Sequence, residues 1–302
     1  MDASVSIIII TYNRPQETLE LLQSIACQNH LQFLKEVIIL NNCSSTDYKI
    51  VSEFIEAHPT LPFQYKMAPE NLGVSKGRNY AIQFASAPVL FLIDDDAELQ
   101  GNNCLEAIAN SFRNHGPEVA IISYLVKYFD NGQIQQNVFP HKQFKRYRHL
   151  PRFEAPYFVG CAHGIRAEAL QKAGGYPTDF FYGMEEYDLS YRLLDAGYKI
   201  WYESNAVILH KEVPHGRQPN AQKLQAMWIN KCIVAWRYLP KRYFISTALM
   251  WSLQYLRGSG FKWAGFWKGW RTIQAIPRTQ VRKRIKTQTL AYLQSIGARL
   301  WY

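Results

Sequence analysis

Apolar runs and amphipathic segments alternate along the first part of the chain. Residues 5–11, 37–40 and 89–93 are rich in large apolar side chains and lack the alternation of a half-exposed strand. Such runs are typical of strands that are covered on both faces. Helical patterns lie between these runs, and the first begins at Pro15. This order predicts an α/β fold, in which a mostly parallel sheet has helices on both faces.

The pattern changes after about residue 116. We expect a strand at 119–128, a polar and basic loop or hairpin at 130–155, a helix at 185–196 closed by Gly197, and short strands at 200–201 and 206–209. From about residue 220, Pro240, the turn at 258–260 and Pro277 break the chain into helix-length segments. Two parts are therefore expected: an α/β domain over residues 1–215 and a helical extension over residues 216–302.

Charge is distributed unevenly between these two parts. The net charge is +10, but 16 of the 34 Lys and Arg residues lie after Glu212, where the chain has no Asp or Glu. The same segment holds seven of the eight Trp residues, and Trp263, Trp267 and Trp270 fall on one face of a helix. Cations mixed with aromatic residues suit anionic lipid headgroups or single-stranded nucleic acid, and the alternative is ordinary core packing. We favour a helical surface that rests on a membrane.

Composition narrows the cellular setting. Hydrophobic residues make up 48% of the chain, which allows a sizeable core and excludes wholesale disorder. The five Cys residues are scattered and odd in number, so neither a disulfide framework nor a zinc cluster is indicated. The start lacks a basic region before its short apolar run, and the apolar-rich segment 243–256 is shorter than the roughly 20 residues of a spanning helix. These features favour a cytoplasmic protein, peripheral on the inner face of the plasma membrane.

Three polar clusters follow predicted strands, at residues 11–14, 41–47 and 94–96. In a parallel sheet, ligands bind beyond the carboxyl ends of the strands. The cluster at 94–96 is three consecutive Asp residues, which repel one another unless a cation or protons neutralise them. Oxygen ligands of this kind suit Mg²⁺ or Mn²⁺ together with substrate phosphates, whereas a solvated acidic turn is the alternative interpretation.

Two further motifs carry charged groups at expected helix starts. Residues 70–79 form a glycine-containing loop that opens onto a helix, where Lys76 and Arg78 favour a phosphate group. Near residue 185, Glu185 and Asp188 share one helical face, while Glu186 points about 100° away from Glu185. One acid of this group can pair with the nearby Arg192 and another can act as a general base, although acids are also common in the first turn of a helix.

Taken together and in this order, the motifs resemble the inverting family 2 glycosyltransferases of GT-A fold. The resemblance covers about residues 4–215 and includes segments 158–166 and 174–177. It implies an enzyme that moves a sugar from a nucleotide-diphospho-sugar to a hydroxyl of a glycan or lipid-linked acceptor. Bacterial polysaccharide synthesis, including rhamnosyl transfer, is the implied setting.

The resemblance also implies roles for individual residues. Asp96 matches the metal-binding end of the family's Asp-x-Asp motif for Mn²⁺ or Mg²⁺, Asp94 lies near the metal or the ribose, and His210 is a further candidate ligand. Glu185 and Glu186 match a Glu-Asp pair whose second member is the base. The residues matched to nucleotide-sugar binding are Thr11, Tyr12, Arg14, Asn41, Asn42, Lys76, Arg78, Asp94 and Asp95.

The chain departs from the family pattern at two places. Asn41 or Asn42 stands where an Asp is usual, and Glu186 replaces the Asp of the Glu-Asp pair. Such changes leave open a non-catalytic nucleotide-sugar binder. A metal held by carboxylates on a diphosphate would also fit a nucleotidyltransferase. The basic tail leaves open a nucleic-acid-binding protein, although we expect no nucleic-acid partner. Alternative basic groups for the diphosphate are Lys211, His215 and Arg217.

Overall fold

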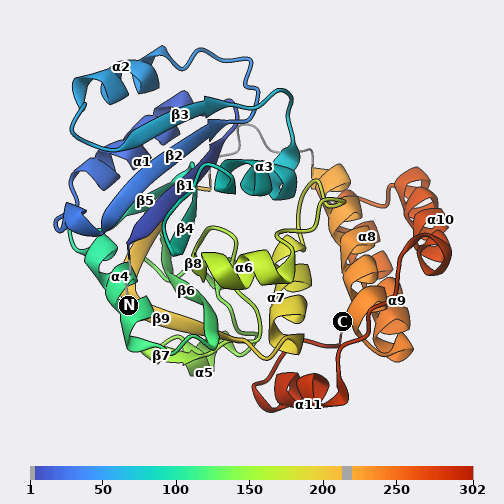
Figure 1. The fold of residues 1–302 in the computed structure, drawn as a ribbon. Helices are drawn as coiled ribbons and strands as arrows, with labels where there is room; N and C mark the ends of the chain where they lie inside the picture. Colours follow the sequence, from blue (N-terminus) through green and yellow to red (C-terminus); the bar gives the residue numbers. More distant parts are fainter. Residues whose placement is uncertain (1–3, 213–219, 302) are drawn as a thin grey trace.

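A single sheet organises the first two thirds of the chain in this computed structural model, which describes residues 4–212 and 220–301 (Figure 1). Its strands are β1 (Val5–Thr11), β2 (Leu34–Asn41), β3 (Phe63–Met67), β4 (Val89–Asp94), β5 (Ala97–Leu99), β6 (Val119–Tyr128), β7 (Arg152–Glu154), β8 (Ala162–Arg166) and β9 (Lys199–His210). They lie in the order β3-β2-β1-β4-β8-β6-β9-β5, and β7 pairs with β9. Strands β3, β2, β1 and β4 are parallel, as are β6 and β9, whereas β8, β5 and β7 run antiparallel to their neighbours.

Burial on both faces explains the apolar runs. Val5, Ile7 and Ile9 of β1 belong to one hydrophobic cluster, and Ile8 belongs to the cluster on the opposite face. Successive side chains of a strand point to opposite faces, so a strand with two covered faces needs apolar residues at every position. The predicted α/β sheet with helices on both faces is confirmed.

Helices cover the two faces in two groups. Helices α1 (Pro15–Ala26), α2 (Lys49–Ala57) and α4 (Cys104–Asn114) pack with the cluster that contains Ile7, whereas α3 (Gly73–Ile82), α6 (Ala167–Ala173) and α7 (Glu185–Asp195) pack with the cluster that contains Ile8. The short helices are η1 (Leu31–Phe33), η2 (Gln136–Val138) and α5 (Phe144–Tyr147). The segment 130–155, expected to be a loop or hairpin, therefore holds η2, α5 and β7.

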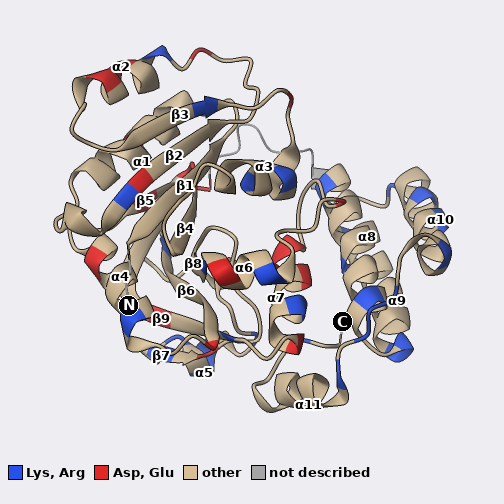
Figure 2. Ribbon diagram, viewed as in Figure 1, with Lys and Arg blue, Asp and Glu red and all other residues tan. Residues whose placement is uncertain are grey.

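The C-terminal segment is helical, as predicted. Its helices are α8 (Asn220–Tyr238), α9 (Lys241–Ser259), α10 (Trp263–Thr279) and α11 (Thr287–Ser295), and Figure 2 shows Lys and Arg positions along α8, α9 and α10. Trp228 of α8 is fully buried and lies against Tyr255 of α9 and Trp270 of α10, with ring centroids 5.8 and 5.6 Å away. Within the described residues, none of the helices combines the length and apolarity that a membrane span needs. The expected boundary at residue 215 lies outside the described residues.

Two details of the predicted elements were wrong. Residues 200–201 and 206–209 belong to one strand, β9, whose pairing with β6 shifts register between Tyr124 and Leu125. A bulge in β9 accommodates the polar residues that looked like a break between two strands. Pro277 does not end α10 but lies inside it, two residues before its last residue, Thr279.

Candidate active site

The predicted motifs meet at one cavity of about 900 Å³. The carboxyl ends of β1 and β4, the start of α7 and the loop around Gly160 contribute to its lining. Helices α8 and α9 supply further lining residues, so the helical extension also contributes to the cavity. The cavity therefore has one wall from the sheet and another from the C-terminal segment.

The three consecutive Asp residues point in different directions. Asp94, at the end of β4, keeps 40% of its side chain exposed and lies 3.4 Å from Nη2 of Arg78. Asp95 is buried, and Arg14 Nη1 donates to its Oδ1 at 2.7 Å. Burial raises the pKa of Asp95 to about 7, although the charge of Arg14 acts in the opposite direction. Asp96 is also buried, with Oδ2 3.0 Å from Arg14 Nη1 and Oδ1 3.2 Å from His210 Nε2.

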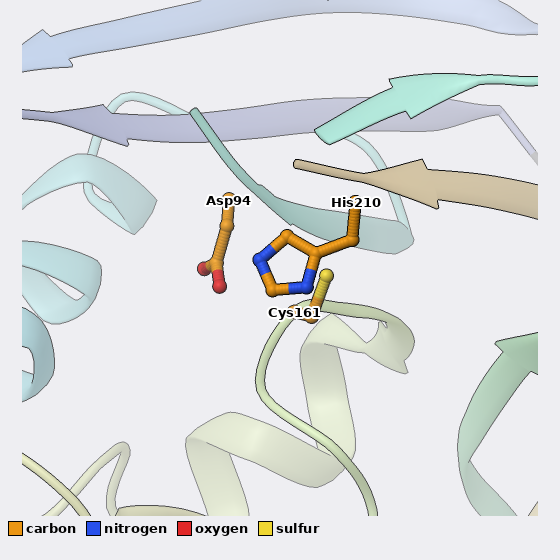
Figure 3. A group of neighbouring side chains, drawn as sticks. All are labelled: Asp94, Cys161 and His210. Carbon is orange, nitrogen blue, oxygen red and sulfur yellow. The ribbon is translucent and has the colours of Figure 1, made fainter. Parts of the chain in front are cut away.

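A set of possible metal ligands lies beside this turn. Ligand atoms of Asp94, Cys161 and His210 are within 4.8 Å of one another (Figure 3). A carboxylate and an imidazole fit Mn²⁺, and the Cys161 thiol is neutral because burial raises its pKa. Burial lowers the pKa of His210, but the ion pair with the Asp96 carboxylate outweighs this effect and raises it. A bound cation would compete with the proton on His210.

The acid pair begins helix α7. Glu185 is buried, its Oε1 lies 3.4 Å from Arg78 Nη1, and its Oε2 has no hydrogen-bond partner among the described residues. Glu186 lies against Gly160, where a Cβ atom would collide with its carboxylate. Burial, together with the negative charge of Glu185, raises the pKa of Glu186 to about 8, against the opposite effect of Arg78. A carboxylate with such a pKa can accept a proton near neutral pH.

Arg78 connects the two ends of the site. Its guanidinium contacts Asp94 and Glu185, donates to the Gly160 carbonyl at 3.0 Å and lies over the Tyr176 ring. The residue is buried, and the surrounding negative groups outweigh burial and raise its pKa, so it remains a cation. One fixed positive charge thus holds the Asp94 turn and the start of α7 in register.

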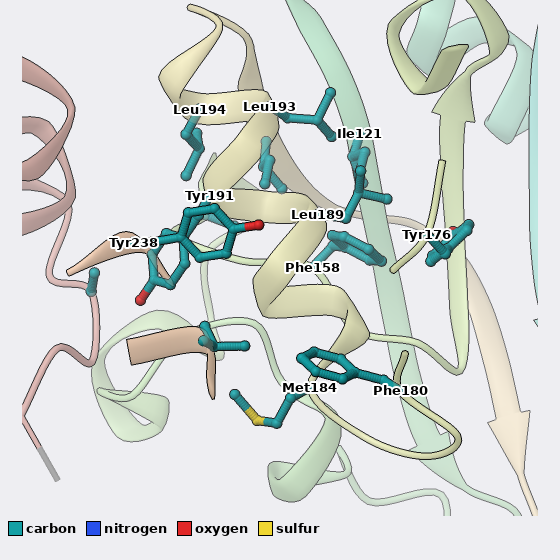
Figure 4. Close-up of a cluster of buried hydrophobic side chains, with 14 of the residues drawn as sticks. Ile121, Phe158, Tyr176, Phe180, Met184, Leu189, Tyr191, Leu193, Leu194 and Tyr238 are labelled. Atoms are coloured by element: carbon teal, nitrogen blue, oxygen red, sulfur yellow. The ribbon is translucent and has the colours of Figure 1, made fainter. Parts of the chain in front are cut away.

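Helix α7 is itself held by the C-terminal helices. Its buried Asp188 accepts hydrogen bonds from Arg192 at 2.8 Å, from Arg237 at 2.9 Å and from the Tyr238 hydroxyl at 2.9 Å. Asp188 is therefore the acid that pairs with Arg192, and it also anchors α8. Figure 4 shows Tyr238 of α8 beside Tyr191 of α7 within the same hydrophobic cluster.

The structure brings most of the predicted site residues together. The predicted residues that line the cavity are Tyr12, Arg14, Asn42, Arg78, Asp94, Asp95, Asp96, Glu185, Glu186 and His210. Asn42 accepts a hydrogen bond from the Leu72 backbone at 3.0 Å, which ties the turn after β2 to the start of α3. The side chain of Asn42 thus lines the cavity. Asn42 is one of the two residues, with Asn41, that the sequence left open as the replacement for the family's usual Asp.

Three predicted residues lie outside the cavity lining. Thr11 is buried and its hydroxyl contacts Thr18 and Tyr48, and Asn41 binds Tyr65 and the backbone of its own turn. Lys76 is exposed on α3. Among the alternative basic groups, Lys211 pairs with Glu20 and Glu98, while His215 and Arg217 lie outside the described residues.

The model of the glycosyl transferase family 2 matches residues 6–174, more than half of the chain. The chain belongs to this family. An uncharacterised protein of Haemophilus influenzae is 29% identical over 175 residues, 57% of this chain and 92% of that protein. A processive diacylglycerol beta-glycosyltransferase of Mycoplasma pneumoniae is 26% identical over 93 residues, 31% of this chain and 27% of that protein.

Solved glycosyltransferases share the fold at low identity. GalNAc-T7 with UDP, GalNAc and Mn²⁺ has a TM-score of 0.66 and 17% identity, over 88% of this chain and 56% of that chain. Residues 1–349 of Staphylococcus aureus TarS with UDP-GlcNAc give a TM-score of 0.63 at 15% identity, over 97% of this chain and 88% of that chain. The mannosyltransferase PcManGT of Pyrobaculum calidifontis, with GDP-Man and Mn²⁺, gives 0.59 at 19% identity, over 96% and 78%. The GT-A fold of this family 2 member is thereby confirmed.

Several residues at or beside the cavity could not be predicted from the sequence. Cys161 is part of the ligand set, but a lone Cys without a spaced partner carries no ligand signal in the sequence. Gln135 Oε1 lies 2.9 Å from His210 Nδ1 and helps to fix the ring. Lys231, Trp251 and Arg299 line the cavity from the helical extension. Their positions depend on how α8, α9 and the segment after α11 pack, and no local sequence pattern reveals this.

Proposed function

We propose that this family 2 member is an inverting, metal-dependent glycosyltransferase that uses a nucleotide-diphospho-sugar donor and an acceptor hydroxyl. The observation that carries the proposal is the cavity shared by the Asp94–His210 ligand set and the acid pair at the start of α7. Solved proteins of the same fold were crystallised with UDP or GDP-mannose, two of them with Mn²⁺. Retention of carboxylates at residues 94–96 and at Glu185 and Glu186 disfavours a non-catalytic binder.

Glu186 is the proposed general base. Its ionised carboxylate takes the proton of the acceptor hydroxyl while that oxygen forms a bond to the anomeric carbon and the bond to the diphosphate breaks. A single displacement of this kind inverts the configuration at the anomeric carbon. Glu185 stays beside Arg78 and keeps the charge of the site balanced. Asp94 and His210, with Asp96 beside them, would hold a divalent cation, which when bound neutralises negative charge on the diphosphate.

Substitution of the two acids tests this assignment. Glu186→Gln is expected to keep the affinity for the donor and to lose about 10²–10⁴-fold in transfer rate, the usual range for acid–base catalysis. Glu185→Gln is expected to have the smaller effect, and Glu168→Gln, at an exposed acid of α6, serves as the matched control. The assay measures release of the nucleoside diphosphate from each of a panel of nucleotide-sugars in the presence of Mn²⁺. A larger loss in Glu185→Gln would move the role of base to Glu185.

We also propose that the acceptor is presented at the inner face of the plasma membrane, as in cell-surface glycan synthesis. Helix α9 supports this location because it exposes several large apolar side chains. Ile245, Leu249, Met250 and Leu253 are each 53–56% exposed, whereas Thr247 and Ser252 are buried. The segment after Glu212 has no acid, and exposed apolar side chains flanked by cations suit an anionic lipid surface.

The aromatic stripe predicted on α10 divides in the structure. Trp263 and Trp267 are 54% and 59% exposed, but Trp270 packs on Trp228. Core packing therefore accounts for Trp270, whereas Trp263 and Trp267 are available for the proposed lipid contact.

Vesicle sedimentation tests the membrane proposal. The full chain is expected to sediment with vesicles that contain phosphatidylglycerol, and Leu249→Glu with Leu253→Glu is expected to weaken binding about tenfold or more, because two apolar side chains are lost. Met67→Glu, at an equally exposed position of β3, is the control. Equal sedimentation of the two variants would refute the surface, and binding to oligonucleotides instead of vesicles would favour the nucleic-acid alternative.

A further inference from the structure

The wall that the helical extension contributes to the cavity carries a distinct chemistry. Lys223 and Lys231 of α8, Trp251 of α9 and Arg299 near the C-terminus line it, and Tyr187 of α7 faces the same space. This segment lies beyond residues 6–174, which the family shares. The wall is therefore a feature of this chain in addition to the donor end of the site.

Lys231 is built into an aromatic setting. Only 7% of the residue is exposed, and its Nζ lies 4.7 Å from the centroid of the Trp251 ring and 5.4 Å from that of Tyr187. The Tyr187 ring stacks on Tyr157, with centroids 4.5 Å apart. Ring faces at this distance stabilise the ammonium group. Glu186, which lines the same cavity, is close enough to act on Lys231 electrostatically.

Positive charge is concentrated in this wall. Burial lowers the pKa of Lys231 to about 7, and the positive charge of Arg299 acts in the same direction, whereas Glu186 acts against both. The chain after Glu212 contains no Asp or Glu that could neutralise the pair from within the same segment. Lys231 and Arg299 repel each other in this wall, and an anion bound to both would stabilise them.

We propose that this wall is the acceptor subsite and that the acceptor carries a phosphate or a carboxylate group. Lys231, held against the Trp251 and Tyr187 rings, and Arg299 would bind the anionic group. The acceptor hydroxyl then lies on the side of Glu186. This inference rests on the proposed function, because it assigns the acceptor half of the same cavity.

Binding of charged and neutral sugars tests the subsite. The full chain is first saturated with Mn²⁺ and the nucleoside diphosphate that it binds best, so that the donor end of the cavity is filled. Calorimetry then compares glucose 6-phosphate and glucuronate with glucose. We expect one or both anionic sugars to bind at least about tenfold more tightly than glucose. A preference for glucose 6-phosphate identifies a phosphate acceptor, and a preference for glucuronate identifies a carboxylate acceptor.

Variants assign the preference to the wall. Lys231→Met, which keeps the size and removes the charge, and Arg299→Gln, at an exposed residue, are both expected to lose it, while Lys268→Gln on α10 keeps it. Thermal unfolding shows whether Lys231→Met is folded, and Arg299→Gln tests the subsite independently of that result. Absence of binding by both anionic sugars, equal binding of glucose, or unchanged preference in Arg299→Gln and a folded Lys231→Met would overturn the inference. A chain that binds no nucleoside diphosphate with Mn²⁺ would refute the proposed function instead.

Discussion

Gly160→Ala tests the position of the proposed base without changing its chemistry. Gly160 lies in the loop opposite α7, and a Cβ atom there would overlap the Glu186 carboxylate and come within 3.2 Å of Arg78 Nη2. The atom that must yield is the end of a flexible side chain, so we expect the change in the free energy of unfolding to be small. The carboxylate has to move, however, because the new methyl group occupies its place.

The expected effect on catalysis follows from the size of that movement. Restoring ordinary van der Waals contact requires a shift of roughly 1 Å, and misplacement of a reacting group by that distance costs about 10²-fold in rate. We therefore expect kcat to fall about a hundredfold in Gly160→Ala, with donor affinity and thermal unfolding close to those of the unmodified chain.

A double-mutant cycle separates this effect from unrelated damage. If the methyl group acts through Glu186, then Gly160→Ala should have little further effect in a chain that already carries Glu186→Gln. The assay is steady-state transfer with saturating donor, together with nucleoside diphosphate binding. Full kcat in Gly160→Ala, or equal losses in both backgrounds, would refute the assignment of Glu186 as a positioned base.

Three other predictions concern charge. The kcat/KM of the unmodified chain should rise with pH through a pKa of about 8, because Glu186 accepts a proton only when it is ionised. In Glu185→Gln the pH–rate profile should show this rise at lower pH, because the negative charge beside Glu186 is removed. Asp94→Asn should weaken Mn²⁺ affinity about tenfold or more in a titration followed by electron paramagnetic resonance, and unchanged affinity would exclude Asp94 as a ligand. Asp188→Ala should cost about 3 kcal/mol in urea unfolding, since it leaves Arg237 and Arg192 without their buried acid.

The sheet and the donor end of the site could be predicted because local sequence determines them. An apolar run such as that of β1 is stable as a strand that is covered on both faces. The polar turn that follows a parallel strand then lies at the edge of the sheet where ligands bind. Asp94, Arg14 and Arg78 met at the cavity for that reason.

The acceptor end could not be predicted in the same way. The position of Lys231 depends on which face of α8 packs on α7, and both faces of α8 carry large apolar residues. Cys161 joins the ligand set only because β8 and the end of β9 bring it beside His210. Long-range packing of this kind leaves no periodic signal in the sequence.

The shared core of α7 and α8 constrains how acceptor specificity can be exchanged between relatives. A chimera joined near residue 215 would combine the α7 of one protein with the α8 of another, and the partners of Asp188 and Tyr191 would no longer match. A junction near residue 175, just after the stretch that the family shares, would transfer α7 together with the helices that pack on it. Recombinants with the second junction should fold more often, and they would carry Glu186 and the acceptor wall as one inherited unit.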